Sequence, residues 1–108
     1  MTDLVIVLST VADDARAEEL ARTLVDERLA ACVHLHTPMT SFYRWKGHVE
    51  RDTERQLVIK TAADRLDALR ARLTTLHPYE LPEFVVVRAD GGSEGYLAWV
   101  KDGTREQT

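Results

Sequence analysis

The chain has 108 residues, a formal net charge of −4, and a composition of 44% hydrophobic and 30% charged residues. This length fits one domain large enough to bury a core, and this balance is typical of a globular protein rather than a disordered one. The mildly acidic charge excludes the basic field that nucleic-acid binding needs, so we expect no nucleic-acid partner.

The cellular compartment follows from cysteine usage and from the apolar runs. The one cysteine, Cys32, cannot form an internal disulfide, which indicates a reducing compartment. The N-terminus leads directly into an apolar run, without the basic segment or cleavage site of a signal peptide. No apolar run exceeds five residues, whereas a membrane-spanning helix needs about 20. We therefore expect a cytoplasmic protein that makes no membrane contact.

The first third of the chain predicts a strand and a helix. Residues 4–8 form a continuous apolar run rich in β-branched side chains, which suits a strand buried on both faces. Asp13 and Asp14 then supply an N-cap. Apolar residues at helical spacing, with the stem of Arg28 along the apolar stripe, predict a helix over residues 14–29.

The middle of the chain predicts a long hairpin. Residues 32–36 alternate as a strand would, and Pro38 interrupts that strand. Residues 41–46 resume with aromatic side chains, Gly47 makes the turn, and residues 48–61 return.

A second helix, a strand and a third helix are expected to follow. Leu66, Leu69, Leu73 and Leu76 share one helical face, and Pro78 cannot continue that helix. Thr61 and Asp64 have the spacing of a capping box. The remaining segments are a strand at residues 84–87, a short helix at residues 94–101, and a flexible tail at residues 103–108 that follows a single domain at residues 1–102.

The order β-α-β-β-α-β plus a C-terminal helix predicts an α+β, ferredoxin-like split βαβ sandwich with an antiparallel sheet and helices on one face. The strands with the most continuous apolar runs, residues 4–8 and residues 57–59, suit the two central positions. Residues 84–87 would form an edge strand without a protecting charge, which invites pairing. This edge and the overlong hairpin predict that subunits join edge to edge.

Five motifs in order resemble one known family. They are Leu-Ala-Ala-Cys-Val at residues 29–33, Ser-Phe-Tyr-Arg-Trp-Lys-Gly at 41–47, Glu54 followed by Leu-Val-Ile-Lys-Thr at 57–61, His-Pro-Tyr-Glu-Leu-Pro-Glu at 77–83, and Tyr-Leu-Ala-Trp at 96–99. The chain is identified by these motifs as similar to the CutA divalent-cation tolerance family over about residues 4–101. The resemblance implies a PII-like homotrimer linked to tolerance of divalent metals, copper especially. It implies no required cofactor, with copper or another divalent cation as the candidate ligand.

The copper ligands that the resemblance implies are only partly present. In metal-binding bacterial relatives a cysteine follows the first strand and two adjacent histidines precede the proline. This chain has Ser9 at the first position and Leu76-His77 at the second. His77 is therefore a candidate ligand that stands alone, because copper prefers several thiolate and imidazole donors. The alternative is a His77 that packs or hydrogen-bonds at the helix end.

Cys32, His34 and His36 form a second candidate metal site. Alternate residues of a strand point to one face, and thiolate and imidazole donors suit a transition metal. Val33 and Leu35 would then face the helices, and the three candidates would face a neighbouring subunit. The alternative is a buried cysteine and two polar residues at a subunit contact.

Lys60 and several aromatic residues indicate a cleft between subunits. Lys60 ends a central apolar strand, where burial without a partner is costly. It is either an anion contact in a cleft or one half of an ion pair with Glu54, Glu80 or Glu83. Aromatic residues outside the helical stripes could line a ligand pocket or anchor an interface. The candidate cleft residues are Trp45, Glu54, Lys60, Tyr79, Glu80, Tyr96 and Trp99.

No catalytic motif is evident, so we expect no enzyme. The sequence has no Ser/His/acid spacing, no Gly-rich phosphate loop and no HExxH helix. Three function classes stay open: a metal-binding or metal-response protein, a PII-like sensor that holds a small ligand between subunits, and a structural trimer that contacts a protein partner.

Overall fold

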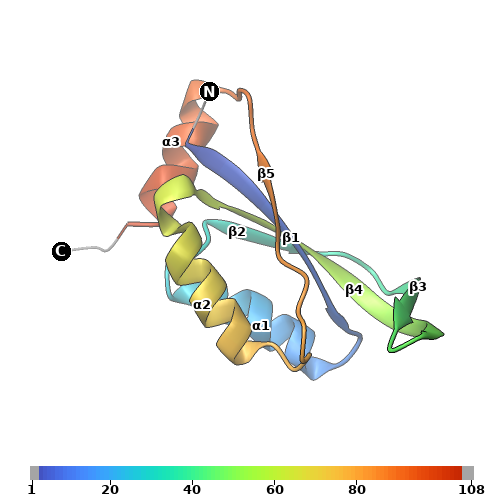
Figure 1. Cartoon of the computed structure of the whole chain (residues 1–108). Coiled ribbons are helices and arrows are strands. Elements are labelled where there is room, and N and C mark those ends of the chain that lie inside the picture. Colours follow the sequence, from blue (N-terminus) through green and yellow to red (C-terminus); the bar gives the residue numbers. More distant parts are fainter. Residues whose placement is uncertain (1–2, 106–108) are drawn as a thin grey trace.

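The structure is a computed structural model that describes residues 3–105 (Figure 1). Its elements confirm the expected order, once β2 and β3 are counted as the single strand that Pro38 interrupts. The bounds are β1 Leu4–Ala12, α1 Ala15–Asp26, β2 Cys32–Leu35, β3 Met39–Trp45, β4 His48–Ala62, the 3-10 turn η1 Ala63–Arg65, α2 Leu66–Leu76, β5 Val85–Arg88 and α3 Glu94–Gly103.

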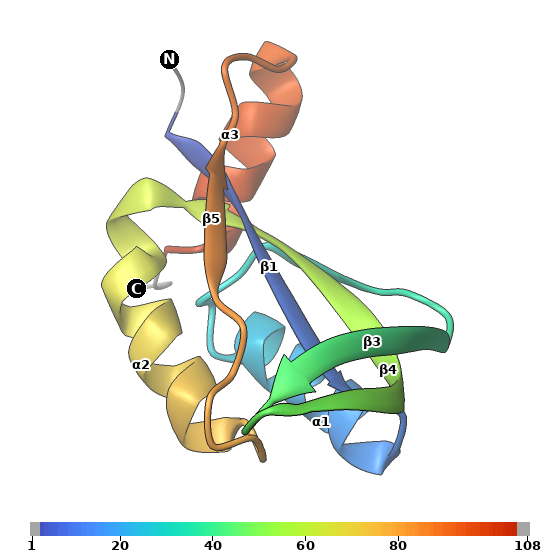
Figure 2. The same cartoon turned by 45° about the vertical axis from the view of Figure 1, so that its right-hand side comes forward.

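The strands form one antiparallel sheet in the order β2-β4-β1-β5, and β3 pairs with β4. β1 and β4 are central, as their apolar runs predict. The first half of β4 pairs only with β3, and this hairpin projects away from α1 and α2 (Figures 1 and 2). Its two-residue turn has φ 49° at Lys46 and 81° at Gly47, the left-handed conformations of the tight turns that match strand twist. The ferredoxin-like α+β fold is confirmed.

One face of the sheet carries α1 and α2 and buries the core. Val5, Val7 and Val11 of β1 are fully buried on this face, and each such side chain stabilises the fold by about 1.5–3 kcal/mol. The contiguous core consists of Val7, Val11, Ala17, Leu20, Leu24, Leu29, Ala30, Leu57, Ile59, Leu69 and Leu73.

The opposite face is covered only at one end. Ile6, Leu8 and Val58 alternate with the core residues and are half-buried. The expectation that residues 4–8 are buried on both faces is therefore wrong for a single chain. The expectation that helices cover one face only is also wrong, because α3 packs on the other face. Its Tyr96 contacts Lys60, which neighbours Ile6 on that face.

The first helix ends three residues earlier than its apolar pattern predicts. Asp14 caps its start as expected, since its side chain accepts the Arg16 N–H. At the C-terminal end Arg28 adopts φ 59°, and the Leu29 N–H reaches back to the Leu24 carbonyl at 3.0 Å. A left-handed residue of this kind stops a helix. Arg28 therefore lies outside the helix, not along its stripe.

The predicted capping box of the second helix is absent. Neither η1 nor α2 has a side-chain cap. The Thr61 hydroxyl instead donates to the Leu29 carbonyl at 2.7 Å inside the core. Thr61 is the last core-facing residue of β4, so its side chain points away from the helix start.

Part of the predicted C-terminal tail is packed. Gly103 closes α3, Thr104 is 1% exposed, and Arg105 pairs with Asp64 at 2.9 Å. The Thr104 hydroxyl donates to the Lys101 carbonyl and so satisfies the end of the helix. Residues 106–108 of the predicted tail lie outside the described residues.

Candidate functional site

The residues expected to share one cleft fall into two separate groups. Glu54 and Tyr79 lie at the base of the hairpin, and Glu80, next to Tyr79 in the sequence, pairs with Lys46 of the hairpin turn beside Trp45. Lys60, Tyr96 and Trp99 lie at the other end of β4. Glu54 and Lys60 are six residues apart on one strand, a span of about 20 Å at about 3.4 Å per residue. A single chain therefore does not gather these residues in one cleft.

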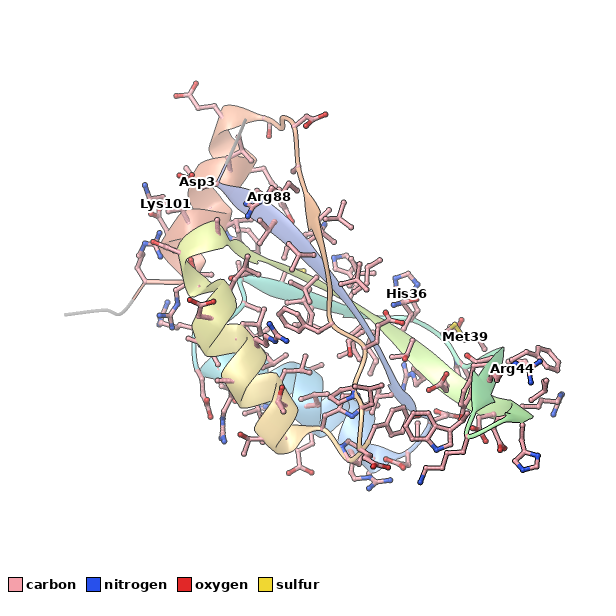
Figure 3. The ribbon with its side chains drawn as sticks, in the orientation of Figure 1. Asp3, His36, Met39, Arg44, Arg88 and Lys101 are labelled. Carbon is pink, nitrogen blue, oxygen red and sulfur yellow. The ribbon has the colours of Figure 1, made fainter. Side chains whose placement is uncertain are left out.

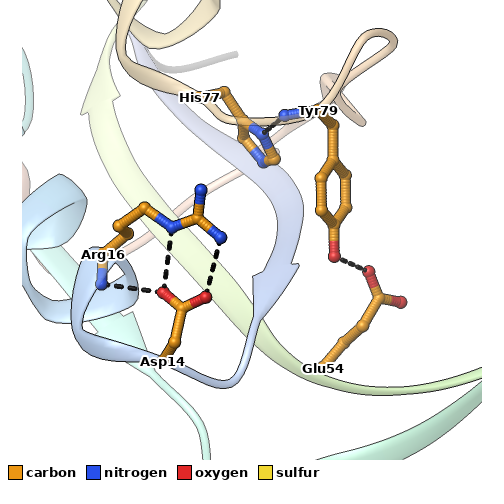
Figure 4. A network of polar contacts seen from close by, with 5 residues as sticks. All are labelled: Asp14, Arg16, Glu54, His77 and Tyr79. Carbon is orange, nitrogen blue, oxygen red and sulfur yellow. Dashed lines mark hydrogen bonds and ion pairs between the residues drawn. The ribbon is translucent and has the colours of Figure 1, made fainter.

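A buried carboxylate binds a tyrosine at the base of the hairpin (Figure 4). Glu54 is 5% exposed, and Tyr79 donates its hydroxyl proton to Glu54 Oε2 at 2.6 Å. Burial, together with this hydrogen bond, raises the pKa of Tyr79 well above its usual value. Next to it, the hydrogen bond that Tyr43 donates to Asp52 raises the pKa of Tyr43 to about 12. Both phenols are therefore protonated donors at neutral pH and supply no catalytic phenolate.

The His77 ring is hydrogen-bonded through both nitrogens. Nε2 lies 2.7 Å from the Thr10 carbonyl oxygen, and Nδ1 accepts the backbone N–H of Tyr79 at 3.1 Å. An amide N–H can only donate, so Nδ1 carries the lone pair and Nε2 carries the proton. The ring is 7% exposed and packs on Tyr79 with centroids 4.7 Å apart (Figure 4). This arrangement leaves no free lone pair for a metal ion, and it matches the packing alternative.

The two other positions of the implied copper site offer no replacement. Ser9 is fully buried on the core face of β1, and its hydroxyl has no hydrogen-bond partner within the described residues. Leu76 packs against the core. A hydroxyl and a leucine do not substitute for thiolate and imidazole donors. The residues present at these three positions therefore do not fit copper.

The second candidate metal site lies on the edge strand β2. Val33 and Leu35 pack against the core as expected, and Cys32 and His34 lie opposite Lys60 and Val58 of β4 on the other face.

His36 lies just beyond β2, between that strand and the hairpin (Figure 3), and its carbonyl accepts a hydrogen bond from Arg55 Nε at 2.8 Å. Among residues 3–105, no three His, Cys, Asp or Glu side chains are grouped to hold a metal ion.

Lys60 has a partner that the sequence did not suggest. Its Nζ donates to the Tyr96 hydroxyl at 3.3 Å and lies 5.4 Å from the centre of that ring. The three acids proposed as partners are engaged elsewhere: Glu54 with Tyr79, Glu80 with Lys46, and Glu83 with Gln56. Within one chain, none of these three acids therefore forms an ion pair with Lys60 among the described residues.

Comparison with known proteins assigns the chain to a family. Residues 5–103 match the family model described as CutA1 divalent ion tolerance protein. The chain belongs to this family. The divalent-cation tolerance protein CutA of Thermus thermophilus is 41% identical over 99 residues, which span 92% of this chain and 96% of that protein. That of Pectobacterium atrosepticum is 40% identical over 105 residues, with 97% and 96% covered.

Solved structures of CutA proteins share the fold. The crystal structure of CutA from Xylella fastidiosa is 42% identical, with a TM-score of 0.92 over 96% of this chain and all of that one. The protein from Thermus thermophilus has a TM-score of 0.90 at 40% identity over 94% and 99% of the two chains. The resemblance drawn from the five motifs is thus confirmed for family and fold.

The structure also bears on membrane contact. Within residues 3–105, every helix is too short or too polar to cross a bilayer. Relatives differ in their named location: the CutA of Arabidopsis thaliana is called chloroplastic and that of Archaeoglobus fulgidus periplasmic.

Proposed function

We propose that this chain is a non-enzymatic protein of divalent-cation tolerance that works as a homotrimer in the cytoplasm, similar in plan to PII-like proteins. The observation that carries the proposal is an apolar sheet face that continues onto an exposed edge strand. Family membership supports the tolerance role. The protonated phenols and the fully bonded imidazole support a role without catalysis.

The edge strand β5 is unusually apolar for an exposed strand. Val85, Val86 and Val87 are 48%, 38% and 44% exposed, and β5 pairs only with β1 among the described strands. An edge of this kind pairs readily with another chain unless charges or bulges block it. The half-buried Ile6 and Leu8 lie directly beside it. Association of copies would cover both surfaces, and the expectation that β1 is buried on both faces would then hold in the assembly.

The exposed tip of the hairpin supports the same assembly. Phe42 and Val49 are 68% and 65% exposed, and the hairpin extends beyond the helices and the rest of the sheet (Figure 1). Apolar side chains on a projecting arm gain stability when they pack on a neighbouring copy. Copies of one chain usually associate with closed symmetry.

The mass in solution tests this proposal. Light scattering coupled to gel filtration should give about three times the chain mass of 12.2 kDa. A monomer at micromolar concentration would contradict it.

For metal binding, the proposal assigns no tight copper site to a single chain. His77 has no free lone pair, and His34 and His36 remain the only nearby imidazole donors on β2 and its extension among the described residues. Copper, or another divalent cation, would then bind weakly to this pair or between copies. A structural trimer that contacts a protein partner remains the outcome if neither metal nor small ligand binds.

A sensor that holds a small ligand is the second candidate. The observation that favours it is Lys60, a half-buried cation that forms no ion pair among residues 3–105 and lies beside exposed aromatic rings.

A further inference from the structure

The ammonium group of Lys60 lies on the partly covered sheet face. Cys32 and Ile6 are its cross-strand neighbours, and it donates a hydrogen bond to the Tyr96 hydroxyl. The ion pairs among residues 3–105 do not include it. An ammonium group has three donors, so two remain for another acceptor. A partly desolvated cation gains most when that acceptor is an anion.

Two stacked rings extend from this cation along α3. The Tyr96 ring contacts both Lys60 and Trp99: the Lys60 Nζ is 5.4 Å from its centre, and the Trp99 ring stacks on it at 5.5 Å with a 28° tilt. Tyr96 and Trp99 are three residues apart, which places them on one face of the helix. Trp99 is 52% exposed although it stacks on Tyr96, so part of its indole surface is open to a further planar group.

We propose that Lys60, Tyr96 and Trp99 form a binding site for a small anion that carries a planar aromatic ring. The anionic group accepts hydrogen bonds from Lys60 Nζ, and the ring packs on the open surface of Trp99. Aromatic stacking and a charge-assisted hydrogen bond are each modest, and together they select a ligand that has both parts.

The proposed site rests on the second candidate function, the small-ligand sensor, and specifies the ligand class. All three residues come from one chain, so the site itself does not require the trimer. Ligand binding and assembly can therefore fail separately. In the proposed trimer, the same sheet face meets a neighbouring copy, which would enclose the ligand between subunits.

Calorimetric titration with three probes tests the site. AMP has both a ring and an anion, adenosine has the ring alone, and inorganic phosphate has the anion alone. The wild-type chain should bind AMP saturably and at least about ten-fold more tightly than either of the other two, because a hydrogen bond to a charged group is worth about that ratio. Equal binding of AMP and adenosine, equal binding of AMP and phosphate, or no saturable binding of AMP would overturn the proposal.

Variants locate the binding. Lys60→Met keeps about the length of the side chain and removes its charge. Trp99→Leu removes the aromatic ring at an exposed position. Each variant should weaken AMP binding about ten-fold. Lys60→Arg should retain binding. Lys101→Met is the matched control, because Lys101 lies on α3 with Tyr96 and Trp99 but outside the cluster. This variant should bind AMP as the wild type does. Unchanged binding in folded Lys60→Met or Trp99→Leu would overturn the proposal, and light scattering on each variant separates loss of the site from loss of assembly.

Discussion

His77 donates its Nε2 proton to the main-chain carbonyl of Thr10, at a distance of 2.7 Å. The contact joins the residue after α2 to the central strand β1, across 67 positions of the sequence. The other ring nitrogen holds the Tyr79 amide, and the Tyr79 hydroxyl reaches Glu54 on β4. One imidazole therefore fixes the path of the loop that leads into the edge strand β5. The position where relatives were expected to bind copper has a structural role in this chain.

We predict that metal binding is weak and depends on His34 and His36 more than on His77. Calorimetric copper titration of the wild type, the His34→Ala/His36→Ala double variant and His77→Ala should show loss of binding in the double variant alone. His77→Ala should lower stability by about 1–3 kcal/mol, since it removes the hydrogen-bond donor of the Thr10 carbonyl. Tight binding that only His77→Ala abolishes would show that the copper site persists.

The unpaired hydroxyl of Ser9 predicts an uncommon stabilising substitution. Its buried oxygen has no hydrogen-bond partner in the described part of the chain, at a cost of about 1–3 kcal/mol. Ser9→Ala should therefore leave the free energy of unfolding unchanged or raise it by about 1 kcal/mol. Thr61→Val is the matched control, because the Thr61 hydroxyl is equally buried but bonded to the Leu29 carbonyl, and its loss should cost about 1–2 kcal/mol. Denaturant unfolding that destabilises both variants equally would contradict the assignment of an unpaired Ser9.

The tyrosine–carboxylate pairs predict a loss of stability at high pH. The folded pKa values of Tyr43 and Tyr79 are raised above 10, the ordinary value. A group whose folded pKa is raised stabilises the fold fully below its unfolded pKa, and that contribution disappears as the pH rises through the folded pKa. Stability should therefore fall from about pH 10 upward. The fall should be smaller in Tyr79→Phe, as thermal unfolding across this range would show; an identical fall would mean that Tyr79 is not involved.

The sequence predicts those features of the fold that local residue patterns determine, and it misses those that depend on a single contact between distant residues. The continuous apolar run of β1 and the repeating leucines of α2 are local patterns, so the order of the elements and the two central strands were correctly predicted. The Lys60–Tyr96 contact joins residues that no repeat connects, and it depends on where α3 packs, which the sequence pattern left open. Thr61 shows the same limit: its spacing to Asp64 fits a cap, but the strand turns its side chain into the core.

We predict that Trp45 and Trp99 lose exposure on assembly. In the single chain Trp99 is 52% exposed and Trp45 is half-buried, and large aromatic residues gain most from desolvation at an interface. Their fluorescence should shift to shorter wavelength with increasing protein concentration. Trp45→Ala should weaken the assembly more than it lowers monomer stability. An emission maximum like that of free indole, with a Trp45→Ala variant that keeps its oligomer mass, would rule this out.

The edge of β5 can be blocked with one substitution. The Ala89 N–H donates to the Leu4 carbonyl, and in an antiparallel pair the bonded residues alternate. The N–H groups of Val85 and Val87 therefore face β1, and that of Val86 points outward from the edge. Proline is tolerated in an edge strand where its missing N–H faced solvent, and it cannot donate to a strand that joins there.

Sedimentation equilibrium of Val86→Pro beside Val86→Thr measures assembly through this edge most directly. We expect Val86→Pro to fold, with the circular dichroism of the wild type, but to have the mass of a single 12.2 kDa chain, whereas Val86→Thr should keep about three times that mass. A folded Val86→Pro that is still trimeric, or a wild type that is already monomeric, would contradict assembly through β5.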